Sequence, residues 1–160
     1  MGFDISSLKR QGFAGFVHVG SLGSQVRQVP QYPGVYVIVR TARIRPHFLR
    51  HNPAGRFKGR NNTVAKTVLK RKWVAMAQVL YIGRSSNLKR RLHQLIQFVD
   101  GKQVGKRGGR YCWQARGHRA FLVAWLRYPQ PRELEAELVA EFVREYGRLP
   151  FANLVQPRVV

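Results

Sequence analysis

Two short apolar runs predict the strands at the centre of the fold. The run Gly34-Val35-Tyr36-Val37-Ile38-Val39 is β-branched and aromatic and follows a proline, which is typical of a central strand over residues 34–40. Apolar residues at positions 79, 80 and 82 predict a second buried strand over residues 78–82, and Gly83 is expected to end it. We expect these two strands to be partners in one sheet.

A helical pattern follows the second strand and gives two neighbouring arginines different directions. Ser85, Ser86 and Asn87 are typical of helix starts. A helix is expected over residues 86–99, with an apolar face formed by Leu88, Leu92, Leu95, Ile96 and Val99. At about 100° per residue, Arg91 falls at the edge of this face, whereas Arg90 points into solvent. An arginine at that edge can bury its stem and direct its guanidinium at an anion, so Arg91 is the candidate anion contact.

The C-terminal part predicts two further strands and a long helix. Residues 110–114 and 121–128 have strand-like patterns, with a hairpin turn expected over residues 116–119. A helix is expected over residues 132–146. Glu135 falls within its apolar arc, where a carboxylate is unfavourable unless a metal ion or an arginine compensates it. The acids outside the arc are Glu133, Glu137, Glu141 and Glu145. The predicted fold class is α/β (α+β), a small antiparallel β-sheet flanked by helices.

The charge of the chain points to a polyanionic partner. Its 160 residues include 29 Lys and Arg against 7 Asp and Glu, a formal net charge of +22. DNA is the expected partner, with RNA left open. A membrane surface is the second choice for such a charge, and no membrane partner is expected. No apolar run reaches transmembrane length, and the N-terminus lacks the shape of a signal peptide. Cys112 is the only cysteine, which excludes an internal disulfide and predicts a cytoplasmic location. The oligomeric state is left open, a dimer included.

A long basic insert separates the two central strands. Residues 41–72 contain no acid, and such a run is unfavourable unless phosphates neutralise it; a solvated basic loop is the alternative. Residues 64–74 within it are compatible with a helix. The glycine-rich loop over residues 101–109 is either a phosphate contact or a connector. We expect residues 1–30 to be a lead-in packing on the core and residues 31–157 to be the domain that carries the insert. The expected nucleic-acid contacts are Arg84, Lys89, Arg90, Arg56, Lys58, Arg60, Lys70, Arg71 and Lys72.

Together these pieces resemble the GIY-YIG nuclease family. Gly34-Val35-Tyr36 and Tyr81-Ile82-Gly83 resemble its two motif strands, and the helix arginine, the acidic helix and a closing asparagine follow in order. The resemblance covers roughly residues 31–155. It implies a site with one divalent cation, Mg²⁺ or Mn²⁺, held by the glutamate. The residues carried over are Tyr36, Tyr81, Arg91, Glu135 and Asn153. The implied function is a metal-dependent endonuclease hydrolysing DNA phosphodiester bonds; the alternative is a non-catalytic DNA- or RNA-binding module on the same fold.

The chain departs from the family pattern in two places. A minimal member joins its motif strands by a short hairpin, where this chain has the insert. Many relatives place the glutamate nearer to the asparagine, which would suit Glu141 as the metal ligand, whereas helix phase favours Glu135. Arg84 stands where many members have lysine and is a candidate second phosphate contact. Which tyrosine orients or deprotonates the attacking water differs between members and is left open.

Overall fold

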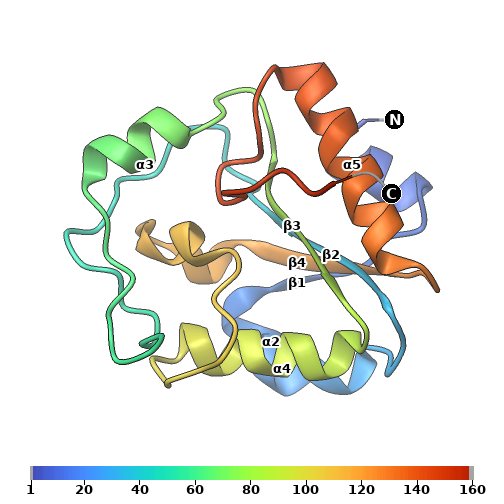
Figure 1. Cartoon of the computed structure of the whole chain (residues 1–160), viewed down its shortest axis with the longest axis horizontal. Coiled ribbons are helices and arrows are strands. Elements are labelled where there is room, and N and C mark those ends of the chain that lie inside the picture. Colours follow the sequence, from blue (N-terminus) through green and yellow to red (C-terminus); the bar gives the residue numbers. More distant parts are fainter. Residues whose placement is uncertain (1, 159–160) are drawn as a thin grey trace.

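The computed structural model describes residues 2–158, which form a four-stranded antiparallel sheet with helices on both faces (Figure 1). The elements are α1 (Ile5–Arg10), β1 (Ala14–His18), η1 (Val19–Ser21), α2 (Leu22–Gln25), η2 (Val26–Gln28), β2 (Gly34–Val39), α3 (Lys66–Lys72), β3 (Val79–Ser85), α4 (Leu88–Val99), η3 (Arg110–Gln114), η4 (His118–Ala120), β4 (Leu122–Arg127) and α5 (Pro131–Tyr146), where η denotes a 3₁₀ helix. The strand order is β1-β4-β2-β3. The predicted fold class is confirmed.

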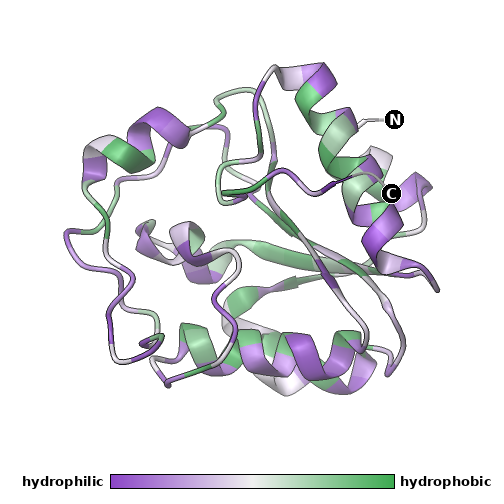
Figure 2. Cartoon of the chain, viewed as in Figure 1, coloured by the Kyte–Doolittle hydropathy of each residue, from purple (hydrophilic) through white to green (hydrophobic). Residues whose placement is uncertain are grey.

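Strand β2 lies between β3 and β4, and burial on both faces explains its unbroken apolar sequence. All of its residues are buried. Tyr36 and Ile38 belong to the core on the α4 face, while Val35, Val37 and Val39 belong to the core on the α5 face. Figure 2 shows the apolar strands between helices whose outer surfaces are largely polar. The sheet therefore has a separate apolar core on each face.

The two long helices lie where the apolar periodicity predicts them. Asn87 caps α4, because its Oδ1 accepts a hydrogen bond from the Arg90 N–H at 3.1 Å. Helix α5 begins at Pro131 and ends at Tyr146, where Gly147, with a φ of 75°, caps it by donating its N–H to the Val143 carbonyl. No helix within residues 2–158 is both long and apolar enough to cross a lipid bilayer.

Three expectations about the strands are wrong. Residues 110–114 form η3 instead of a strand, and η4 lies where a hairpin turn was expected. The two sides of β4 are occupied by β1 and β2, so η3 has no edge of β4 to join. Strand β3 continues through Gly83 to Ser85, because Gly83 pairs with Tyr36 and Ser85 with Gly34. This extension places Arg84 on the strand.

The insert folds against the core. Gln114 is fully buried, and its Nε2 donates hydrogen bonds to the carbonyls of Leu49 at 2.9 Å and Val64 at 2.8 Å. Its Oε1 accepts a third from the Val64 N–H at 3.0 Å. The ring of Phe48 stacks on Phe151 with centroids 5.8 Å apart. We call the segments around Leu49 and Val64 the arms of the insert. The buried amide of Gln114 and the stacking of Phe48 on Phe151 thus hold these arms against the domain.

Candidate functional site

Tyr36 and Tyr81 come together on the α4 face of the sheet because of the strand register. Tyr36 pairs with Gly83 and Ile38 pairs with Tyr81, so the tyrosines occupy diagonal positions on neighbouring strands. Their ring centroids are 5.9 Å apart. A Cβ at Gly83 would lie 2.6 Å from Tyr36 Cζ and 2.7 Å from Tyr81 Cε1. The absence of a side chain at Gly83 therefore makes room for both rings.

Both phenols are protonated in the free protein at neutral pH. Burial raises the pKa of Tyr36 above its ordinary value, and the Arg91 cation offsets part of this effect. Burial raises the pKa of Tyr81 well above its ordinary value, with a further increase from Tyr36 and an opposing contribution from Arg91. The pair can donate hydrogen bonds to an anion or a water molecule, but it provides no phenolate base in this state.

Arg91 is a buried guanidinium with an unsatisfied nitrogen. The residue is 7% exposed, and its Cζ lies 5.5 Å from the centroid of the Tyr36 ring. Its Nη1 is buried and has no hydrogen-bond partner within residues 2–158, and no carboxylate in that range pairs with it. Arg90 is exposed, so the directions predicted from helix phase are confirmed. Because a buried cation without a counter-ion is unfavourable, a bound anion would stabilise this arrangement.

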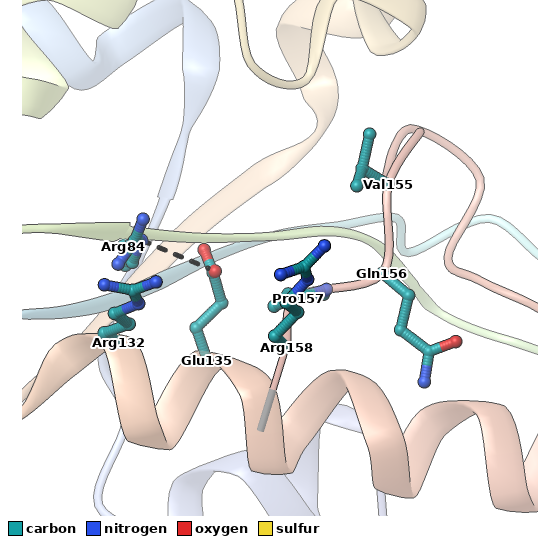
Figure 3. Close-up of a pocket in the computed structure, with 7 residues that line it drawn as sticks. All are labelled: Arg84, Arg132, Glu135, Val155, Gln156, Pro157 and Arg158. Carbon is teal, nitrogen blue, oxygen red and sulfur yellow. Dashed lines mark ion pairs between the residues drawn. The ribbon is translucent and has the colours of Figure 1, made fainter. Parts of the chain in front are cut away.

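Glu135 approaches from α5 and meets Arg84 at the outer edge of β3. Its side chain is 13% exposed, and its Oε1 lies 3.5 Å from Arg84 Nε. Burial raises the pKa of the Glu135 carboxyl, and the Arg84 cation acts in the opposite direction. Figure 3 shows Arg132 and Arg158 on either side of Glu135, lining with it a pocket of about 330 Å³. A metal ion or an arginine was expected to compensate the charge of this inward carboxylate, and the structure contains the arginine.

A smaller cavity connects the tyrosine side with the glutamate side. It has a volume of about 210 Å³, and its lining includes Tyr81, Gly108, Glu135 and Asn153. A Cβ at Gly108 would lie 2.3 Å from the Tyr81 hydroxyl oxygen and 3.4 Å from Arg91 Nη2. The loop between α4 and η3 therefore passes directly over the site. The adjacent glycines at positions 108 and 109 are the sequence signal for this close approach.

Asn153 holds the outer edge of β3 with its side chain. Its Oδ1 accepts a hydrogen bond from the Ile82 N–H at 2.9 Å, and its Nδ2 donates one to the Ile82 carbonyl at 2.9 Å. The Ala152 N–H adds a hydrogen bond to the Leu80 carbonyl at 2.8 Å. Asn153 lies beside the cavity, but its contacts are those of a residue that positions β3 and the C-terminal segment.

A third, strongly basic cavity extends the site along the start of α4. It has a volume of about 500 Å³, and no acidic side chain lines it. The N-terminus of the 12-residue helix α4 adds partial positive charge. The cavity is lined by Arg84, Ser85, Ser86, Arg90, Arg91, Gln94, Lys106 and Pro131. This cavity brings the predicted anion contact Arg91 together with Arg84 and Arg90.

Three cations at the site, Arg110, Arg132 and Arg158, were not predicted. Arg132 precedes Glu135 by three residues on α5, and this spacing was an available signal that they share a face. Arg110 reaches the site from the first residue of η3 and Arg158 from the C-terminal segment, whereas Lys106 comes from the glycine-rich loop that was expected as either a phosphate contact or a connector. No periodicity governs such segments, so the sequence gives no direction for their side chains.

The predicted contacts in the insert lie apart from this site. Arg56, Lys58, Arg60, Lys70 and Arg71 are exposed and line none of the three cavities; we call these residues the insert surface. Figure 1 shows α3 and the insert on the opposite side of the molecule from α5. Lys72 is half-buried, and its Nζ donates to the Asn153 carbonyl at 3.3 Å. Burial and then Arg148 lower the pKa of Lys72. Lys89 is half-buried at the start of α4.

The donor set around Glu135 fits one hydrated divalent cation. Within residues 2–158, no group of three or more His, Cys, Asp or Glu side chains could hold a metal ion together. Mg²⁺ commonly binds through one or two carboxylates, several waters and the phosphates of a substrate. One inward carboxylate beside a basic cavity matches that mode, with the phosphate arriving from outside.

Glu141, the alternative metal ligand, lies elsewhere on α5. Six residues separate it from Glu135, an axial rise of about 9 Å. It lines none of the three cavities. It is also not the plain surface residue that helix phase predicted, because it is half-buried and its Oε2 has no hydrogen-bond partner within residues 2–158. Its Oε1 lies 3.9 Å from Arg144 Nη2.

The site thus combines cations for an anionic group, two protonated phenols and a single carboxylate. The three cavities meet where Arg84, Tyr81 and Glu135 surround the outer edge of β3. The chemistry of these side chains is what indicates a function. Comparison with protein-family models, with curated proteins and with solved structures finds no match to this chain.

Proposed function

We propose that this protein is a metal-dependent endonuclease of the GIY-YIG type that hydrolyses phosphodiester bonds in DNA. Arg91 carries the proposal, because it is a buried guanidinium with an unsatisfied nitrogen next to two protonated phenols. A phosphodiester supplies the negative charge and the acceptor oxygens that this arrangement lacks. The net charge of +22 favours a polyanion over a single anion.

Each side chain of the site has a role in such a reaction. Arg91 and Arg84 neutralise the charge that builds up on the phosphate in the transition state. Tyr36 and Tyr81 donate hydrogen bonds that orient the phosphate or the attacking water. The Glu135 carboxylate is available to a cation or a proton once Arg84 turns to the phosphate. When Mg²⁺ is bound at Glu135, it supplies Lewis-acid stabilisation of the phosphate oxygens.

A plasmid-nicking assay with and without Mg²⁺ tests this function, using Arg91→Met and the matched control Arg90→Met. Methionine keeps an apolar stem and removes the charge. We expect wild type to nick supercoiled plasmid only with Mg²⁺, and Arg91→Met to be slower by about 10²- to 10³-fold, the usual effect of removing one preorganised donor. Arg90→Met should lose much less activity than Arg91→Met, because Arg90 lines the same basic cavity but its charge is exposed to solvent. A larger loss in Arg90→Met would contradict the assignment of Arg91.

One observation favours a second candidate, a non-catalytic DNA- or RNA-binding module on the same surface. Glu135 is the single carboxylate that lines the three cavities, and Arg84 already pairs with it. The Arg84 cation competes with a metal ion for that carboxylate. Under this alternative, the plasmid stays intact with Mg²⁺ while gel-shift binding persists, so the same experiment separates the two functions.

We further infer that the protein acts in the cytoplasm. Cys112 is the only cysteine of the chain and is fully buried. Burial raises the pKa of its thiol, which keeps it protonated and unreactive. A chain that uses no disulfide suits a reducing compartment. Fractionation of cells that express a tagged full chain tests this location.

A further inference from the structure

A fourth cavity lies away from the Arg84–Glu135 pair, beyond the other end of β2. It has a volume of about 340 Å³, within the range of small-molecule sites. The first residues of the insert form one wall, and η4 with its flanking residues forms the other. Apolar side chains, among them Ile44, Trp73 and Phe121, share the lining with Arg45 and Arg116. No acidic residue lines it.

The walls of this cavity are held in place by Arg40. This residue is 3% exposed and donates hydrogen bonds to the carbonyls of Ala42 at 2.9 Å, Arg43 at 2.7 Å and Ala77 at 2.8 Å. Its Cζ also lies 4.8 Å from the centroid of the Trp73 ring. The cavity is therefore part of a hydrogen-bonded framework.

The other wall is fastened as well, and a large apolar side chain stays exposed at the mouth. The Arg116 N–H donates to the His47 carbonyl at 2.8 Å, which ties the two walls together. Ile44 is 84% exposed, although the carbonyls of Arg43 before it and His47 after it accept hydrogen bonds. Together with Trp73 and Phe121 in the lining, Ile44 gives the cavity an apolar wall that suits a ligand with an apolar surface.

The lining restricts the chemistry of that ligand. Apolar walls favour a flat or apolar group, while Arg45 and Arg116 without an acidic neighbour favour a group attached to an anion. A nucleobase with its phosphate combines these properties, and single-stranded nucleic acids are bound by such mixtures of apolar platforms and cations.

We propose that this cavity binds an unpaired nucleobase of the strand that the protein cleaves, an inference that rests on the proposed function. Val35 pairs with Arg84, and Arg40, the first residue after β2, lies five residues beyond Val35, about 16 Å at the usual rise of a strand. At about 3.4 Å per nucleotide of a duplex strand, the unpaired base lies about five nucleotides from the phosphate bound near Arg84. The protein thereby selects DNA with a bulge, a mismatch or a single-stranded end.

The test compares two duplexes that differ in one base, using the full chain and gel-shift titration at low salt. One duplex is fully paired, and the other carries a single unpaired 2-aminopurine whose fluorescence reports stacking. We expect wild type to bind the second duplex about ten-fold more tightly, the usual effect of one stacked base, with a change in fluorescence on binding.

Two variants that keep the net charge locate the effect. Ile44→Ser removes the apolar rim, and Ala120→Trp fills the cavity from an exposed position in its lining. Both should bind the two duplexes with nearly equal affinity. Met76→Ser is the matched control, because Met76 is 85% exposed and lies outside this cavity, and it should keep the preference.

The outcomes separate this inference from the proposed function. Binding of both duplexes with equal affinity by wild type would overturn the nucleobase site while nuclease activity still stands. A preference that persists in both cavity variants would overturn the assignment to this cavity. No binding of either duplex would overturn the proposed function and this inference together.

Discussion

Asn153→Ala should destabilise the fold strongly, although the residue borders the site. The change removes two buried hydrogen bonds to the backbone of Ile82, one accepted at 2.9 Å and one donated at 2.9 Å. Each bond contributes about 1 kcal/mol net, and a buried backbone group left without a partner costs about 1–3 kcal/mol. We expect a total loss of about 2–4 kcal/mol, a large part of the 5–15 kcal/mol typical of a whole domain.

Thermal unfolding followed by circular dichroism measures this loss. A domain of this size loses about 2–4 °C in Tm per kcal/mol, so the expected decrease is about 4–16 °C. Asn61→Ala is the control: Asn61 is exposed, its Oδ1 accepts one hydrogen bond from the Thr63 N–H, and the change should stay within about 0.5 kcal/mol. Cleavage by Asn153→Ala, assayed well below its Tm, should stay close to wild type. An unchanged Tm with lost cleavage would refute the positioning role and make Asn153 a catalytic residue.

Four further outcomes are expected. Glu135→Gln should abolish Mg²⁺-dependent nicking, whereas Glu141→Gln should cleave like wild type. A Mg²⁺ titration of both variants decides which acid binds the metal. The reverse result would assign the metal ion to Glu141. Burial raises the pKa of Glu135, so its charged form opposes folding at neutral pH. Urea titrations should therefore show that Glu135→Gln is at least as stable as wild type at neutral pH. The difference in stability should shrink as the pH falls and the wild-type carboxylate becomes protonated. Gly83→Ala should lower the Tm and weaken cleavage, because the new Cβ meets the Tyr36 ring; an unaffected variant would show that the rings move freely. Filter binding should weaken by about 10³- to 10⁵-fold between 50 and 200 mM salt if about 6 to 10 phosphate contacts form, and a flat slope would exclude the insert surface as a nucleic-acid contact.

The side chains that the sequence places correctly belong to regular helices. Arg91 is buried and Arg90 is exposed because a fixed 3.6-residue period separates them. The same period directs Glu135 inward. For Glu141 the period is a weaker guide, since a neighbouring element can cover a residue at the edge of the polar face, and here one carboxylate oxygen is buried.

Contacts between distant segments are what local patterns fail to predict. Residues 110–114 have the alternation of a strand, but the neighbouring places in the sheet are taken by β1 and β2, and Gln114 is needed between the arms of the insert. The pairing of Asn153 with Ile82 joins residues 71 positions apart, so no local period contains it. The ion pair of Arg84 with Glu135 depends in addition on β3 continuing past Gly83.

The buried amide of Gln114 has a consequence for how the insert surface meets a polyanion. Because Gln114 holds Leu49 and Val64, the basic arms lose little backbone freedom on binding, where a flexible basic tail would lose about 1–2 kcal/mol per ordered residue. Native trypsin digestion should accordingly cut after the exposed Arg56, Lys58 and Arg60 more slowly than in the urea-unfolded chain, because the flanking Gly55 and Asn62 are hydrogen-bonded into the fold. The backbone positions that carry the cations of the insert are therefore spaced in a fixed way before a nucleic-acid strand binds.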